Sequence, residues 1–147
     1  MTPTLNGRLQ SRLFLVAFVG VPVALLLGVV LPRPTADTTL GDMYRVFFVA
    51  LAIVAVVGLV WELVWHALQQ LRWEKDWPTL FGLLTGVPEG VVVWLLLGAG
   101  IPVDVGDVDG STFLWMFVIT WIVIWLVANG PLQIVFIRWR FRGGRFV

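Results

Sequence analysis

The sequence predicts an all-α membrane protein, a bundle of four transmembrane helices with both termini in the cytoplasm. Hydrophobic side chains make up 59% of the 147 residues, and the mean hydropathy is +0.94, whereas soluble domains use about 45–50% apolar residues. Four apolar runs, at 13–31, 46–68, 79–100 and 113–137, each match the ~20 residues that a helix needs to cross a bilayer. Because the connections are short, residues 1–147 are expected to form a single transmembrane domain.

Composition excludes several kinds of site. The chain has no cysteine and one histidine, so it supplies no disulfide, no thiolate metal site and no pair of histidines for a haem. We therefore expect no metal and no cofactor. No nucleophile elbow, phosphate loop or zinc motif is present, and the two serines, Ser11 and Ser111, lie outside the runs. Catalysis is the least favoured class, with an intramembrane transferase that uses only acids as the remaining enzymatic alternative.

The first run, 13–31, follows a short polar head that carries Arg8 and Arg12. A signal peptide has a similar charged start, but its apolar core is usually ~7–15 residues and ends in a small-x-small cleavage site. The run is longer and no such site precedes Pro32, which indicates a retained span. Pro22 removes one helical hydrogen bond and predicts a kink.

The second and third runs flank a compact polar turn at 71–78. The third run contains Gly82, Gly86 and Gly90 at spacings of four, a pattern that lets another transmembrane helix approach closely. Pro88 predicts a second kink there.

The fourth run, 113–137, is interrupted at 129–131, where Pro131 predicts a third kink. A basic tail at 138–147 follows, with four arginines expected to contact lipid or a partner: Arg138, Arg140, Arg142 and Arg145. Each charge near anionic headgroups is worth about 1 kcal/mol. The tail is interpreted as a topology anchor, with docking of a cytoplasmic partner as the alternative; its position beside the membrane explains it more simply than nucleic-acid binding.

Basic residues set the predicted topology. With a cytoplasmic amino terminus, eight of the ten basic residues share the cytoplasmic side: Arg8, Arg12, Arg72, Lys75, Arg138, Arg140, Arg142 and Arg145. The positive-inside rule then places both termini in the cytoplasm and the two acidic loops outside. The abundance of arginine among the basic residues suggests a bacterial protein, so we expect a multi-pass protein of the inner (cytoplasmic) membrane.

Short internal similarities are compatible with a tandem duplication of a two-helix hairpin. Gly-Val-Pro occurs at 20–22 and 86–88, and Leu-Leu-Leu-Gly at 25–28 and 95–98. A duplication would give two parallel hairpins related by an axis along the membrane normal. Chance is the competing explanation, because these residue types are so frequent here.

Polar residues recur at one predicted depth on three helices. At 1.5 Å per residue, Glu62, Glu89 and Asn129 lie about 12, 15 and 12 Å from the cytoplasmic ends of their runs. His66 and Gln133 follow one turn after Glu62 and Asn129. A charge in hydrocarbon is costly, so we expect these five residues to form an intramembrane polar cluster.

Several chemistries fit such a cluster. In a purely structural role, each Glu would be protonated and would donate a hydrogen bond to one of the carbonyls of Leu84 and Val127, which the prolines leave free. As a proton or cation path, the two acids would titrate as a coupled pair. A divalent-cation site has no supporting ligand spacing, and a cleft for a quinone or a lipid headgroup, lined by tryptophans, is a further variant.

Function is expected to be that of a non-catalytic accessory or assembly subunit of a larger membrane complex, since the short loops leave little machinery outside the bilayer. The alternative is a small oligomeric proton- or cation-coupled transporter or channel that uses Glu62 and Glu89. Expected partners are the lipid bilayer and other membrane subunits or further copies of the chain, not nucleic acid.

Overall fold

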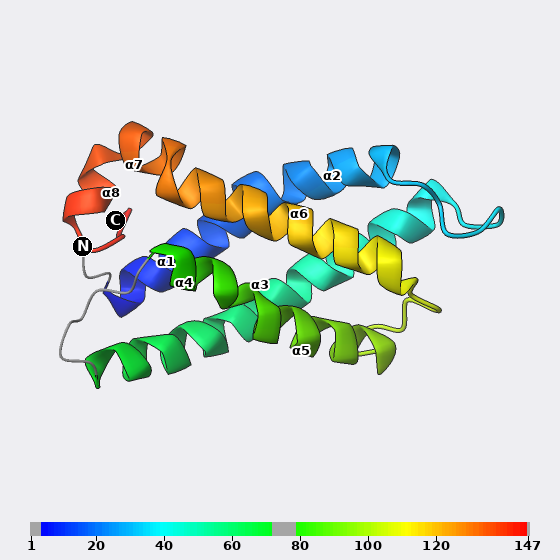
Figure 1. Cartoon of the computed structure of the whole chain (residues 1–147), viewed down its shortest axis with the longest axis horizontal. Coiled ribbons are helices and arrows are strands. Elements are labelled where there is room, and N and C mark those ends of the chain that lie inside the picture. The colour runs from blue at the N-terminus through cyan, green and yellow to red at the C-terminus, as the bar shows by residue number, and fades with distance from the viewer. Residues whose placement is uncertain (1–3, 72–78, 147) are drawn as a thin grey trace.

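The fold is all-α, as predicted. The computed structural model describes residues 4–71 and 79–146, except for the side chain of Arg140. Within these ranges, four helical segments are long and apolar enough to cross a membrane: Leu5–Val30, Leu40–Gln70, Thr79–Gly98 and Gly110–Val135. Figure 1 shows them side by side and running in alternating directions, with both chain ends at one end of the bundle and loops 31–39 and 99–109 at the other.

The first span begins earlier than predicted. It consists of α1 (Leu5–Leu15), a π-helical turn (Val16–Gly20) and α2 (Val21–Val30). Thr4 caps α1 by accepting a hydrogen bond from the Gly7 N–H, so the expected polar head is helical and carries Arg8 and Arg12 into the bundle. The Val21 N–H donates to the Val16 carbonyl, five residues back, and this wider turn accommodates Pro22.

The second span, α3 (Leu40–Gln70), is an uninterrupted helix of 31 residues. Thr39 and Asp42 form a capping box in which each side chain accepts a hydrogen bond from the other residue's backbone N–H. The cap explains why the helix starts six residues before the predicted apolar run. The predicted polar turn at 71–78 lies almost wholly outside the described residues, as do Arg72 and Lys75 of the topology argument.

The third and fourth spans are interrupted near their prolines. The third consists of α4 (Thr79–Leu84) and α5 (Gly86–Gly98), separated at Thr85, with Pro88 in the first turn of α5. The fourth consists of α6 (Gly110–Asn129) and α7 (Pro131–Val135), separated at Gly130. A further break at Phe136, where φ is −107° and ψ is 67°, turns α8 (Ile137–Phe141) away, so the fourth span ends before the predicted boundary.

Asp109 caps α6 at the loop end of the bundle. Its carboxylate accepts hydrogen bonds from the Ser111 hydroxyl and from the Thr112 backbone N–H, at 2.6 and 2.7 Å. These bonds hold the pKa of Asp109 below its ordinary value. A charged cap at this position also complements the helix dipole.

The apolar core lies in the half of the bundle near the loops. All four spans contribute buried side chains, among them Ala24, Leu27, Phe47, Ala50, Val93, Leu97, Phe113 and Met116. In the amino-acid sequence these positions fall in the part of each helix closest to loops 31–39 and 99–109. In the other half of the bundle, buried polar side chains such as Gln69 and Glu89 lie among buried apolar ones such as Leu15 and Leu132.

Aromatic rings of α6 pack against glycines of the third span. A Cβ at Gly86 would overlap the Trp121 indole, and one at Gly90 would overlap the Phe117 ring, while Gly82 lies against Trp125. The spacing of four on both helices matches these contacts turn by turn. The glycines thus accommodate large side chains rather than a bare helix backbone.

The carboxyl-terminal segment packs on α1. The Trp139 indole N–H donates to the Ser11 hydroxyl at 2.7 Å, and the Ser11 hydroxyl donates to the Gly144 carbonyl at 2.9 Å. The Thr4 N–H donates to the Gly143 carbonyl at 2.8 Å. Gly143 and Gly144 both have positive φ angles, which favour glycine. The predicted tail therefore has a fixed backbone path. Membrane orientation of the termini and the tandem duplication stay predictions.

We expect Gly86→Ala to destabilise the protein, because the added methyl group meets an indole that is held by its hydrogen bond to the Leu83 carbonyl. Overpacking of this kind costs ~1–3 kcal/mol, which thermal unfolding in detergent would measure. Gly98→Ala is the matched control in the same helix, since nothing lies within 4 Å of the added atom; helix propensity predicts no loss there. Equal destabilisation by the two substitutions would contradict the packing role of Gly86.

Candidate functional site

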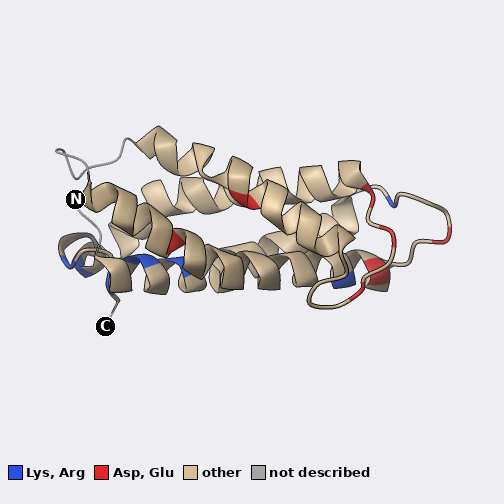
Figure 2. Cartoon of the chain, turned by 90° about the horizontal axis from the view of Figure 1, so that it is seen from below, with Lys and Arg blue, Asp and Glu red and all other residues tan. Residues whose placement is uncertain are grey.

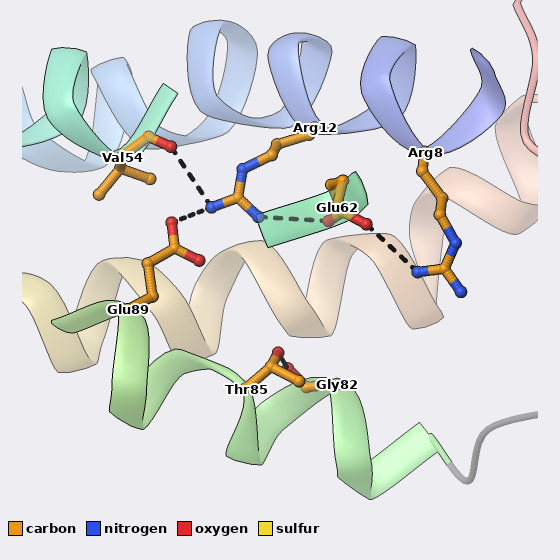
Figure 3. A network of polar contacts seen from close by, with 7 residues as sticks. All are labelled: Arg8, Arg12, Val54, Glu62, Gly82, Thr85 and Glu89. Carbon is orange, nitrogen blue, oxygen red and sulfur yellow. Dashed lines mark hydrogen bonds and ion pairs between the residues drawn. The ribbon is translucent and has the colours of Figure 1, made fainter. Parts of the chain in front are cut away.

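The Arg12 guanidinium lies between two carboxylates inside the bundle (Figure 3). Its Nη1 donates to Glu62 of α3 at 3.2 Å, and its Nη2 donates to Glu89 of α5. Nη2 also lies 3.4 Å from the Val54 carbonyl, which accepts from it. One side chain of α1 thereby joins the second and third spans.

Arg8 extends the same contact toward the chain termini. It precedes Arg12 by four residues, so both arginines occupy one face of α1. Its Nη1 donates to the second oxygen of Glu62 at 3.2 Å, and its Nη2 donates to the Gln69 side chain at 2.7 Å. Two arginines and two glutamates give this arginine–glutamate cluster (Arg8, Arg12, Glu62 and Glu89) no net charge.

Burial makes this neutrality necessary. Only 1% of the Glu89 surface is exposed, and the exposed fraction of the Arg12 side chain is 10%. Removing a charge from water costs several kcal/mol unless it is paired and hydrogen-bonded. Gly58, one turn before Glu62, leaves the space for the guanidinium, because a Cβ there would overlap it. The Trp121 ring adds a cation–π contact, 5.8 Å from Arg12 Cζ.

The predicted polar cluster contained Glu62 and Glu89 but not the two arginines. The structure brings Glu62 and Glu89 to the same guanidinium, whereas Arg8 and Arg12 were assigned to a head outside the first span. Glu62 and Glu89 accept hydrogen bonds from arginine side chains, where hydrogen bonds to the Leu84 and Val127 carbonyls had been expected. The Thr4 capping signal and the spacing of four between the arginines were the available clues that α1 starts earlier.

The other predicted members lie outside these ion pairs. Asn129 donates to the Trp125 carbonyl of its own helix at 2.8 Å, and Gln133 donates to the Ala128 carbonyl at 3.4 Å. His66 Nδ1 is buried with no hydrogen-bond partner among the described residues. In that part of the chain, no group of three His, Cys, Asp or Glu side chains could hold a metal ion.

A cavity of about 600 Å³ adjoins the cluster. Polar side chains on its wall include Arg8, Arg12, Glu62, Asn129 and Gln133, so it connects the two amides with the ion pairs. Four tryptophans also line it: Trp65, Trp121, Trp125 and Trp139. The indole N–H groups of Trp121 and Trp125 donate to the Leu83 and Thr79 carbonyls at 3.1 and 3.0 Å. A cleft lined by tryptophans was one of the variants that the sequence left open.

Charges are distributed unequally along the bundle. Figure 2 shows basic residues mainly at the end that holds the termini, and the acids of the two loops at the opposite end. Three arginines of the carboxyl-terminal segment are exposed: Arg138, Arg142 and Arg145. The side chain of Arg140 lies outside the description.

Comparison with protein-family models, with curated proteins and with solved structures gives no match for this chain.

Arg12→Gln is expected to destabilise the bundle by ~3–5 kcal/mol, because it leaves Glu89 buried without its countercharge. Arg12→Gln combined with Glu89→Gln restores neutrality, with one arginine and one glutamate remaining, and should recover most of the loss. Unfolding in detergent of Arg12→Gln, Glu89→Gln and the double variant would complete a double-mutant cycle.

Arg145→Gln serves as the control for loss of a positive charge, since Arg145 is exposed and its side chain contacts only the Arg142 carbonyl among the described hydrogen bonds. It should leave stability within about 0.5 kcal/mol. Purely additive effects of Arg12→Gln and Glu89→Gln would show that these two side chains do not stabilise the fold as a pair.

Proposed function

We propose that this chain is a non-catalytic accessory or assembly subunit of a larger complex in the bacterial inner membrane. The observation that carries the proposal is the bridging of Glu62 and Glu89 by Arg12. Acids inside a membrane span often mark an ion pathway. Here the two acids cross-link three helices, which favours a structural role for them.

The exterior of the bundle supports the same role. Large apolar side chains are exposed on the first span, among them Phe18, Leu26, Val29 and Val30. Such surfaces contact acyl chains or neighbouring helices in a bilayer. The loops at 31–39 and 99–109 add little surface outside the membrane. A rigid bundle with an apolar exterior suits association through its helices.

The second candidate is a proton- or cation-coupled transporter or channel built on Glu62 and Glu89. One observation favours it, since the cavity brings open space to Glu62. Coupling would require the carboxylates to exchange arginine for a proton or cation. The apolar core beyond the cluster would also have to open.

The charge-neutral pair Arg12→Gln/Glu89→Gln separates the two candidates, because it removes one acid without leaving an unpaired charge. The assembly role predicts that a tagged chain carrying both changes recovers the same membrane partners, in the same ratio, as the unchanged chain in mild detergent. Transport predicts that proton or cation flux into vesicles reconstituted with the purified chain is lost in this variant. Thermal unfolding of both proteins controls for loss of fold.

Isolation of the unchanged chain alone, as a symmetric oligomer, would contradict the assembly role. Flux through the reconstituted chain that disappears in the charge-neutral variant would establish the transport alternative.

A further inference from the structure

The cavity is a chamber closed toward the loops. Its wall is built from all four spans and from α7 and α8. At its inner end stand Val16, Val54 and Ile124, and the buried apolar core continues beyond them. A volume of about 600 Å³ falls in the range of small-molecule sites, ~300–1,000 Å³.

The positive charge around the chamber comes from exposed arginines and not from the ion pairs. The charged lining side chains are Arg8, Arg12 and Glu62, and together with Glu89, which pairs with Arg12 from outside the lining, they carry no net charge. The exposed arginines of the carboxyl-terminal segment lie at the same end (Figure 2). A cleft edged by one sign of charge concentrates ligands of the other sign.

Arg8 can donate to a bound anion. A guanidinium carries five N–H hydrogens, and the described bonds of Arg8 use two of them, one to Glu62 and one to Gln69. Arginine also matches the planar geometry of carboxylates and the oxygens of phosphates. Asn129, which is exposed, adds an amide group to the lining of the same cavity.

The remaining wall is suited to an apolar group. The N–H groups of Trp121, Trp125 and Trp139 are bonded to protein oxygens, so what these indoles offer a ligand is their ring surface. Leu15 and Ile124 add aliphatic surface to the same wall. The cavity therefore combines a basic polar group with a wide aromatic surface.

We propose that this chamber binds an anionic amphiphile, a molecule that joins a phosphate or carboxylate to a hydrocarbon or aromatic part. The acidic group pairs with Arg8, and the apolar part lies against the indoles. The inference goes beyond the assembly role, because binding of such a molecule requires no partner subunit.

Isothermal titration of the full chain in an uncharged detergent tests this with four probes: hexyl phosphate, inorganic phosphate, hexanol and hexyltrimethylammonium. We expect hexyl phosphate to bind once per chain and at least about tenfold more tightly than each of the others. Asn129→Asp adds a negative charge to the lining outside the ion pairs and should weaken hexyl phosphate binding at least about tenfold. Asn6→Asp is the matched control, since Asn6 is exposed on α1 and does not line the cavity.

Equal weakening by Asn129→Asp and Asn6→Asp would overturn the proposal, because it would locate binding on the general surface. Equal affinity for inorganic phosphate, or tighter binding of hexyltrimethylammonium, would also overturn it. If Asn129→Asp fails to fold, Gln133→Glu adds the same charge to the same lining. If the unchanged chain recovers no membrane partners in mild detergent but still binds hexyl phosphate, that result would count against the assembly role alone.

Discussion

The pairing of Arg12 with Glu62 and Glu89 is the contact on which the remaining structure depends. A buried charge in a medium of low polarity needs a countercharge and hydrogen bonds. One guanidinium supplies both to two helices at once. The position of α1 against α3 and α5 is therefore fixed by electrostatics as well as by packing, and the π-helical turn and Gly58 let the helix take that position.

The interior of the bundle differs on the two sides of this contact. Toward the loops, side chains such as Phe47 and Leu97 fill the interior. Toward the termini, the interior holds the cluster and the cavity, and the carboxyl-terminal segment packs on α1 through Trp139 and Gly143. A packed apolar core excludes water. The half of the bundle near the loops therefore separates the cavity from the far end of the bundle.

The ion pairs and the apolar core make it energetically costly to open a path through the bundle. Opening a path through the protein would require breaking buried ion pairs and separating the apolar core, whereas binding at the termini end requires neither. The proposed assembly role uses the rigid exterior, and the proposed ligand site uses the cavity. Both leave the arginine–glutamate cluster intact, as its burial and its neutrality favour.

The amino-acid sequence by itself determined the fold class, the four apolar spans and the need for Glu62 and Glu89 to be compensated, because hydropathy and the cost of buried charge are local properties. Only the tertiary structure decided what compensates them. The signal that α1 starts at Leu5 is a cap, which is weaker than an apolar run, so the arginines were assigned outside the span. Which helix faces lie together, and which predicted members such as His66 stay outside the ion pairs, depends on contacts between residues far apart in the chain.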